Sequence, residues 1–174
     1  MTATPFSVRA ATAADLDAIV EFNARLAHES EGKALDRAAL TRGVEFALAD
    51  RSSLAYWVVE VADDPADPES RWVVGQAGIT REWSDWRAGW IWWFQSVYVH
   101  PDYRGRGVFR LLHARIRELA RASEGVIGLR LYVESSNERA QQVYRSLGMT
   151  PGGYDVYEDL WGIPAAPRPP GHRP

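Results

Sequence analysis

Apolar positions along the chain follow two spacings, one typical of strands and one typical of helices. β-Branched and aromatic residues cluster or alternate in five segments, bounded by turn-forming residues, and this favours strands there. These segments are residues 6–9, 53–61, 72–80, 90–99 and 126–133. A sixth segment, 154–160, alternates weakly and predicts a last strand. Apolar residues recur at intervals of three and four in four further segments, which predicts helices near residues 12–26, 36–49, 108–120 and 135–147.

Helix boundaries are marked by capping residues. Thr12 and Asp15 have the spacing of a helix start, and Ser135 and Glu138 have the spacing of a capping box. Gly148 follows the last helical stripe, as expected of a helix C-terminus. Residues 62–70 are acidic and contain two prolines, so we expect a hairpin loop there.

This order of elements predicts an α/β (α+β) fold. Consecutive strands pair first as an antiparallel meander, and the later strand–helix–strand segment implies a parallel pair with a crossover. The result is a mixed sheet with helices on both faces. At 174 residues we expect one domain over residues 6–161. Residues 162–174 are rich in proline and are predicted to form a disordered tail.

Composition narrows the function classes. Hydrophobic residues make up 46% of the chain and charged residues 25%, which is typical of a soluble globular protein. The net charge of −3 offers no basic field for nucleic acid or an anionic membrane. The chain has no cysteine, and its four histidines lack the spacing of metal ligands, so no metal site is expected. No apolar run reaches transmembrane length and no signal peptide is visible, which predicts a cytoplasmic protein.

A strand, a glycine- and arginine-rich loop and a helix follow one another over residues 97–112. His100-Pro101-Asp102 ends the strand, and Arg104-Gly105-Arg106-Gly107 leads into the helix. Helix N-termini have unpaired N–H groups and partial positive charge, glycines let phosphate approach the backbone, and arginine adds forked donors. The segment therefore predicts a diphosphate cradle. The alternative is a tight surface turn with solvated arginines, because the loop lacks the complete fingerprints of a P-loop or a dinucleotide fold.

The same segment resembles motif A of the GCN5-related N-acetyltransferases, the GNAT superfamily. The family pattern is Gln/Arg-x-x-Gly-x-Gly/Ala, and Arg104 and Gly107 fill its first two positions. Phe109 stands where the pattern has Gly or Ala, so its side chain must point away from the diphosphate. The resemblance implies acetyl-CoA as cofactor, bound by the preceding strand and the loop. The implied contacts are Val97, Tyr98, Val99, Arg104, Gly105, Arg106, Gly107, Val108, Phe109 and Arg110.

A second segment, residues 137–149, resembles the family's Asn-x-x-Ala-x-x-x-Tyr-x-x-x-Gly-Phe motif. It implies that Asn137 meets the cofactor arm and that Tyr144 contacts the cofactor and acts as general acid toward the leaving thiolate. Met149 replaces the usual phenylalanine. Without the resemblance, Asn137 is equally a helix-capping residue and Tyr144 a packed tyrosine.

The resemblance covers residues 6–161 and implies the GNAT fold: a mixed, mostly antiparallel sheet of six to seven strands with about four helices on both faces. The implied function is acetyl-CoA-dependent N-acetyltransfer to a primary amine, by direct attack of the neutral amine on the thioester. The acceptor is a small-molecule or peptide amine, and family members are often homodimers. The alternative is a non-catalytic acyl-CoA-binding or sensing module of the same fold.

The proton released by the amine needs an acceptor. Many family members use a glutamate on the strand before the loop, but Trp93 stands at that place and its neighbour on the same face is Gln95. Glu82, at the end of the previous strand, is the nearest carboxylate and is the predicted base. The alternatives are a solvated turn carboxylate and a water relay without a single base.

Five of the eight tryptophans fall between positions 83 and 93. Trp90, Trp92 and Phe94 alternate onto one face of a strand and Ile91 and Trp93 onto the other, so one face is expected to be core. Core packing, an acceptor pocket and a dimer interface are all open readings of the cluster. The predicted acceptor-site residues are Asn23, Glu29, Trp83, Trp86 and Gln95.

Overall fold

The computed structural model describes residues 5–62, 70–159 and 161 of the chain. The chain divides into two compact units, Met1–Glu138 and Arg139–Pro174. The first unit holds the sheet and helices α1 to α3, and the second holds all but the first residue of α4 (Glu138–Ser146). The single domain expected over residues 6–161 stays a prediction.

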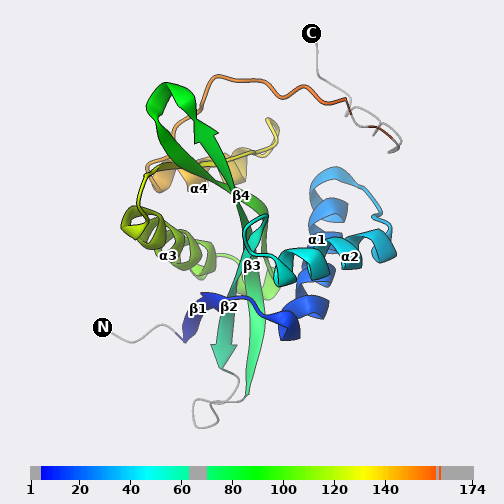
Figure 1. Ribbon diagram of the computed structural model, residues 1–174. Coiled ribbons are helices and arrows are strands. Elements are labelled where there is room, and N and C mark those ends of the chain that lie inside the picture. The colour runs from blue at the N-terminus through cyan, green and yellow to red at the C-terminus, as the bar shows by residue number, and fades with distance from the viewer. Residues whose placement is uncertain (1–4, 63–69, 160, 162–174) are drawn as a thin grey trace. The chain divides into compact units, whose positions relative to one another are not determined.

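The described residues form one five-stranded sheet whose strands lie in chain order (Figure 1). The strands are β1 (Phe6–Ala10), β2 (Ala55–Ala62), β3 (Arg71–Ser84), β4 (Gly89–Val99) and β5 (Val126–Leu131). Neighbours from β1 to β4 are antiparallel, and β5 joins β4 in parallel. Parallel neighbours need a crossover connection, and α3 (Val108–Ala122) forms it. The predicted mixed sheet is confirmed.

The sheet has fewer strands than the six to seven that were expected. The missing strand is the one predicted over residues 154–160, whose described residues 154–159 have no strand conformation. Their side chains are exposed, Tyr157 to 94%. Three of these six residues are acidic, and acidic side chains are depleted in strands because they neither pack nor pair well there. Weak alternation without a buried face was therefore insufficient to form a strand.

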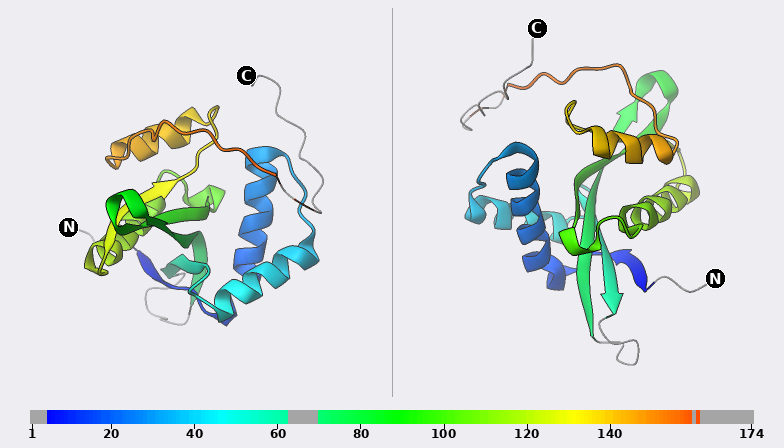
Figure 2. Two further views of the ribbon diagram at one scale, coloured as in Figure 1. Left: turned by 45° about the horizontal axis from the view of Figure 1, so that its top comes forward. Right: turned by 180° about the vertical axis from the view of Figure 1, so that it is seen from behind.

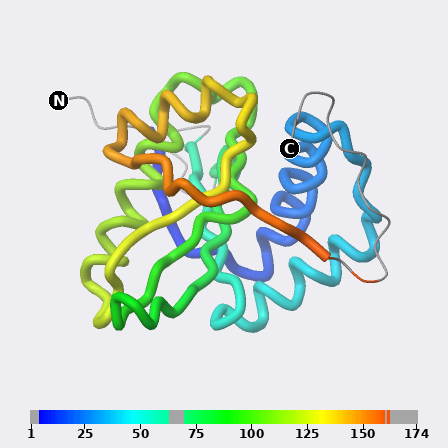
Figure 3. Tube along the Cα trace, turned by 90° about the horizontal axis from the view of Figure 1, so that it is seen from above, coloured from blue at the N-terminus to red at the C-terminus, as the bar shows by residue number. Residues whose placement is uncertain are grey.

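Helices cover both faces of the sheet in the first unit, as predicted. Helices α1 (Leu16–Glu31) and α2 (Arg37–Ala49) lie on one face, here called the α1 face, and α3 lies on the other, the α3 face (Figures 2 and 3). The α3 face buries apolar side chains of the strands and of α3, among them Val59, Ile79, Trp92, Phe94, Val108, Leu112 and Ile116. The α1 face buries a second cluster that includes Ile19, Val20, Val44, Ala47, Tyr56 and Val58.

The tryptophan-rich strand alternates as its sequence predicts. Trp92 and Phe94 belong to the core cluster of the α3 face and are 8% and 3% exposed. Ile91 is buried and Trp93 is half-buried, and both point to the α1 face. The core reading of the cluster is therefore correct for Trp92.

Arg9 and Asp15 fix the start of α1. The Asp15 carboxylate accepts a hydrogen bond from the Thr12 N–H at 2.7 Å and two from the Arg9 guanidinium at 2.7 Å each. Burial would raise the pKa of Asp15, but the bonds from Arg9 and Thr12 outweigh it and hold the pKa below its ordinary value. The predicted helix start at Thr12 and Asp15 is confirmed, as one 3₁₀ turn leading into α1.

Two predicted segments fall largely or wholly outside the described residues. They are the acidic hairpin loop, of which residues 63–69 are not described, and the proline-rich tail, residues 162–174. In the described part of the chain, no helix combines the length and the apolarity that crossing a membrane requires. The same residues hold no group of three or more His, Cys, Asp or Glu side chains that could bind a metal ion.

His113 on α3 makes stability depend on pH. Its ring is 4% exposed and stacks on Phe94, with 5.7 Å between centroids, and its Nε2 has no hydrogen-bond partner among the described residues. Burial, with a smaller contribution from Arg117, lowers the pKa of His113 below the ordinary 6.5. The unfolded chain therefore takes up a proton that the folded chain resists, and stability is lost as pH falls through 6.5.

We expect His113→Phe to flatten this dependence. Between pH 7 and 5 the free energy of unfolding of the wild type should fall, with a contribution from this one proton of at most about 1.4 kcal/mol per pH unit. The variant should lack that contribution in urea titrations. His28→Asn, which removes an exposed imidazole from α1, is the control. An equal slope in wild type and His113→Phe would show that His113 does not cause the loss.

Candidate active site

The predicted cradle begins where β4 ends. One 3₁₀ turn, Pro101–Tyr103, follows β4, and α3 starts at Val108. Gly105 and Gly107 have φ angles of 77° and 83°, in the left-handed region that glycine adopts without strain. A Cβ on either residue would meet nothing within 4 Å. The loop backbone is therefore open to a ligand beside the first N–H groups of α3, which have no partner within the helix.

Two arginines, Arg106 in the loop and Arg110 in the first turn of α3, form no ion pair with the described residues. Arg106 and Arg110 are exposed, and neither meets a carboxylate in that part of the chain. The Arg106 guanidinium lies over the Tyr103 ring, 5.3 Å from its centroid. Guanidinium groups bind phosphate through forked donors, so these two side chains can add charge to the backbone donors.

Phe109, which departs from the family pattern, packs beneath α3. Its ring centroid lies 6.2 Å from that of Phe94 and 6.1 Å from that of His113. The ring thus contacts the aromatic layer between α3 and the sheet, which agrees with the expectation that it points away from a diphosphate.

β4 separates from β5 before it reaches the loop. The parallel pairing ends at Phe94 and Leu131, whereas β4 continues to Val99. Residues 95–99 therefore have no partner on β5. The Val99 carbonyl accepts a hydrogen bond from Arg104 Nε at 2.9 Å instead. A strand edge that opens next to a helix N-terminus can pair with an extended ligand as an added strand would.

A β-bulge lies in the same stretch of β4. Ser96 and Val97 together face Ala77 of β3, where regular pairing would place one residue. Ser96 has a φ of 46°, which is rare for a residue with a side chain. The extra residue reverses the alternation, so that Val97 and Val99 pack with the α3-face cluster and Tyr98 faces α1.

A buried amide network supports the bulge from the α1 face. Gln76 is fully buried, and its Nε2 donates to Asn23 Oδ1 at 2.6 Å and to the Ser96 carbonyl at 3.3 Å. Asn23 Nδ2 donates in turn to the Tyr56 hydroxyl at 3.0 Å. Gln76 Oε1 has no hydrogen-bond partner among the described residues. Asn23, predicted to bind the acceptor, is thus placed in this network, 7% exposed.

Glu29 and Arg104 meet although they were predicted for different ligands. Glu29 Oε2 accepts a hydrogen bond from Arg104 Nη2 at 2.6 Å, and Oε1 accepts one from the Tyr98 hydroxyl at 2.6 Å. The Tyr98 ring packs on Phe22 of α1, with 5.0 Å between centroids. These contacts join α1, β4 and the loop.

Glu82 occupies a cluster on the α1 face, just before β4 and β5 separate. Its carboxylate accepts hydrogen bonds from the Trp93 indole N–H at 2.6 Å and from Arg130 Nη1 at 3.0 Å. The Arg130 guanidinium lies 5.5 Å from the Trp93 ring centroid, and the Tyr132 ring contacts Trp93 at a tilt of 34°, with 4.4 Å between centroids. The Glu82 side chain remains 44% exposed. Gln95, the next residue on this face of β4, donates to Thr80 Oγ1 at 3.2 Å.

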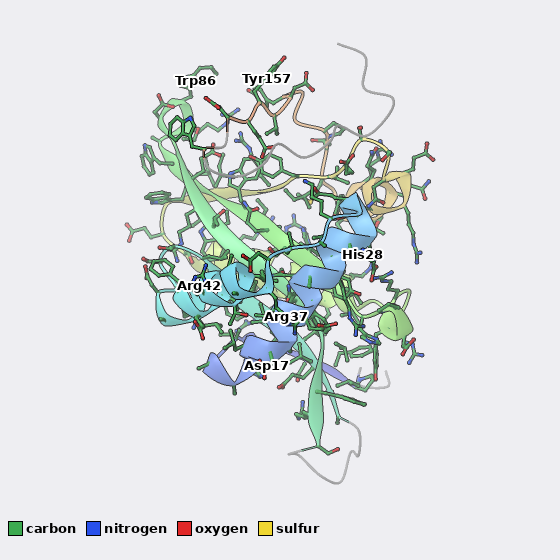
Figure 4. The ribbon with its side chains drawn as sticks, turned by 90° about the vertical axis from the view of Figure 1, so that its right-hand side faces the viewer. Asp17, His28, Arg37, Arg42, Trp86 and Tyr157 are labelled. Carbon is green, nitrogen blue, oxygen red and sulfur yellow. The ribbon has the colours of Figure 1, made fainter. Side chains whose placement is uncertain are left out.

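The other three tryptophans of the cluster between positions 83 and 93 lie at the β3–β4 hairpin. Trp83 packs edge-on against Trp90, with 5.2 Å between centroids, and the two are 51% and 40% exposed. Trp86 sits in the 3₁₀ turn Asp85–Arg87 at the hairpin tip and is 84% exposed (Figure 4). Packing explains Trp83 and Trp90 in part and does not explain Trp86.

Tyr144 belongs to the second compact unit, on α4. It is partly buried, and this burial raises the pKa of its hydroxyl above the ordinary 10. Asn137 precedes α4, and its N–H donates to the Glu134 carbonyl at 2.9 Å. Gly148 ends the helix region with a φ of 84°, as predicted for a residue after the C-terminus. An approach of Tyr144 to the cradle stays a prediction.

Sequence reasoning missed three residues of the site. Gln76, Tyr56 and Arg130 form hydrogen bonds or ion pairs with predicted site residues. All three lie within strands, outside the motifs on which the site prediction was based. Gln76 offered a signal, because a lone amide among Val73, Val74 and other apolar residues must find a partner once buried. Nothing in the local sequence said which partner that would be.

Comparison with known proteins places the chain among acetyltransferases. Residues 18–149 match the family described as the Acetyltransferase (GNAT) family. The crystal structure of a possible acetyltransferase from Clostridium difficile 630 is similar over 90% of this chain and 98% of that one, with 41% identity and a TM-score of 0.77.

Curated relatives match over shorter stretches. Thialysine N-epsilon-acetyltransferase of Bos taurus is 33% identical over 91 residues, which cover 52% of this chain and 52% of that protein. Streptothricin acetyltransferase of Escherichia coli is 27% identical over 120 residues, 64% of this chain and 66% of that protein. The match thus spans about half the length of the first of these relatives.

The buried amide network leads to a stability prediction. Gln76→Leu should lower the free energy of unfolding by about 1–3 kcal/mol, because Asn23 Oδ1 and the Ser96 carbonyl lose their donor. Tyr56→Phe removes one bond of the same network without touching the bulge and should cost about 0.5–1.5 kcal/mol. Urea unfolding of both variants measures the difference. A smaller loss for Gln76→Leu than for Tyr56→Phe would mean that Gln76 does not support the bulge.

Proposed function

We propose that this chain, which belongs to the acetyltransferase (GNAT) family, is an N-acetyltransferase that uses acetyl-CoA to acetylate a primary amine. One observation carries the proposal: the pairing of β4 with β5 ends at Phe94, and β4 continues without a β5 partner to Val99, just before the glycine loop at the start of α3. An open strand edge and a helix N-terminus in sequence suit a ligand that has an amide-containing arm and a diphosphate.

The residues fit such a ligand. In the proposal, the loop from Arg104 to Arg110 holds the diphosphate, and Val97, Tyr98 and Val99 hold the pantetheine arm, with help from Asn137. The open space at Gly105 and Gly107 supports the first assignment, as do Arg106 and Arg110, which form no ion pair with the described residues. The unpaired edge of β4 supports the second. Acetyl-CoA, when bound, supplies a thioester carbonyl that a neutral amine can attack.

Side chains of this chain would transfer the protons of the reaction, and its backbone would stabilise the charge that develops on the carbonyl oxygen. A backbone N–H at the β4 bulge can polarise the carbonyl under attack. Glu82 is our candidate to take the ammonium proton. Its half-exposed carboxylate keeps lone pairs beyond those used by Trp93 and Arg130, and water can relay the proton to it. Tyr144 gives a proton to the leaving thiolate, and its raised pKa keeps it protonated at neutral pH.

An amine acceptor is supported by the relatives, two of which are named for acetylating thialysine and streptothricin. The acceptor of this chain is a small-molecule or peptide amine. The rival function is a non-catalytic acyl-CoA sensor, favoured by the tryptophan at position 93 where many family members have a glutamate. Turnover with any member of an amine panel separates the two.

Calorimetric titration with acetyl-CoA tests the cofactor site. We expect micromolar binding by the wild type and, for Gly107→Glu, a loss of at least about tenfold, since a carboxylate in the cradle repels phosphate. Gly107→Asn is the matched control, because asparagine tolerates the left-handed region and adds no charge. If the folded wild type does not bind, or if both variants bind equally, the cradle assignment is wrong.

Tyr144→Phe tests the general acid. We expect kcat to fall by about 100-fold, the lower end of the usual contribution of a general acid, with acetyl-CoA affinity unchanged. Because the hydroxyl is protonated up to a pKa above 10, kcat of the wild type should show no loss from this group between pH 7 and 9. Tyr157→Phe, which removes the hydroxyl of an exposed tyrosine in the same unit, should keep full activity. Equal kcat for Tyr144→Phe and wild type would remove Tyr144 from the mechanism.

A further inference from the structure

A carboxylate near the C-terminal end of α1 reaches the segment that we assign to the cofactor. Glu29 accepts one hydrogen bond at each oxygen, from the Tyr98 hydroxyl of β4 and from the Arg104 guanidinium of the loop, both at 2.6 Å. Its side chain is 38% exposed, and that of Arg104 is 35% exposed. One side chain of α1 thus binds both Tyr98, near the end of β4, and Arg104, the first residue of the cradle.

Arg104 is held on two further sides. Its Nε donates to the Val99 carbonyl at 2.9 Å, and its guanidinium lies 5.3 Å from the centroid of the Tyr98 ring. Ion pair, backbone hydrogen bond and ring contact therefore fix the planar group in one orientation. An arginine held this way defines the path of the backbone from Val99 into the glycine loop.

The charge of Arg104 is already compensated. Burial would raise the pKa of Glu29, but hydrogen bonds from Tyr98 and Arg104 outweigh it and lower that pKa, so the carboxylate is ionised at neutral pH. Arg106 and Arg110 have no such partner among the described residues. To reach a phosphate, Arg104 would have to give up a short, partly shielded ion pair, whereas the other two arginines give up none.

We propose that Glu29 is a positioning residue for the cradle and that Arg104 stays paired with it when the cofactor is bound, leaving Arg106 and Arg110 as the cationic phosphate contacts. This inference rests on the proposed function, since it takes residues 104–110 as the diphosphate site. It gives Glu29, predicted as an acceptor contact, a role on the cofactor side. It also makes the cradle depend on the placement of α1.

Whether Glu29→Gln weakens or tightens the binding of coenzyme A distinguishes a positioning role of Arg104 from direct contact with the phosphates. Glu29→Gln keeps the side-chain length but removes the charge and one acceptor oxygen. If Arg104 is a positioning group, Glu29→Gln and Arg104→Gln each weaken coenzyme A binding by about 3- to 10-fold, and the double variant is no weaker than the weaker single one, because the two act as one unit. If Arg104 instead turns to the phosphates, Glu29→Gln frees it and tightens binding, which overturns the proposal.

The salt dependence of binding separates charge from structure. The double variant Glu29→Gln/Arg104→Gln removes the neutral pair as a whole and should leave the ratio of affinities at low and high salt as in the wild type, whereas Arg106→Gln should reduce that ratio, because only an uncompensated cation is screened strongly. A reduced ratio for the double variant contradicts the proposal. Glu118→Gln breaks a surface ion pair with Arg115 on α3 and is the matched control for loss of one carboxylate.

Calorimetry with coenzyme A on the full chain, beside thermal unfolding of each variant, gives all these results. A folded wild type that does not bind coenzyme A contradicts the proposed function itself. A wild type that binds, with Glu29→Gln equal to it, contradicts only the role of Glu29.

Discussion

The end of pairing between β4 and β5 is the constraint on which the site depends. A strand that continues without its neighbour exposes N–H and C=O groups along one edge, and such groups must find other partners. In this chain the Val99 carbonyl takes the Arg104 guanidinium as partner, and the chain then turns into α3, whose first N–H groups have no partner within the helix itself. Backbone groups of the strand edge and the loop are therefore part of the polar surface of the site, and side chains around them hold that backbone in place.

The supporting side chains come from the α1 face. Gln76 binds the carbonyl at the bulge, and Glu29 holds Arg104 against the end of the strand. Each supporter is held by a second group, Asn23 in one case and Tyr98 in the other. The α3 face contributes packing, since Val97, Val99 and Val108 join its apolar cluster. Helix α1 therefore supports the backbone at the end of β4 through polar contacts, whereas α3, which begins at the predicted cradle, supports it through apolar packing.

What could be predicted from the sequence was local in the chain. The loop, its two glycines and the start of α3 lie within a dozen residues. Over that stretch the alternation typical of a strand gives way to turn-forming residues and then to the three-and-four spacing typical of a helix. The end of β4, the start of α3 and the alternation of Trp92 and Phe94 followed from that pattern, whereas the left-handed conformation of the two glycines was not predicted. The bulge did not, because one extra residue changes the facing of every later side chain without changing composition. The hydrogen-bond partners of Asn23, Glu29 and Glu82 lie between 11 and 75 positions away in the sequence. The spacing of apolar residues along the chain does not predict contacts over such separations. The last strand failed because alternation alone does not form a strand that has nothing to bury.

The contrast between the two faces of the sheet has a consequence for engineering this chain. The α3 face is a nearly continuous apolar layer, so a substitution there is tolerated only if it preserves side-chain volume and packing. Variants selected from libraries on that face will therefore differ mostly in expression level and melting temperature. The α1 face carries amide, carboxylate and guanidinium groups that form hydrogen bonds to the backbone of the strand and loop, either directly or through one other side chain. A library confined to these polar positions would leave both apolar clusters unchanged. The α1 face thus combines residues that keep the protein folded with residues that hold the strand and loop backbone in place.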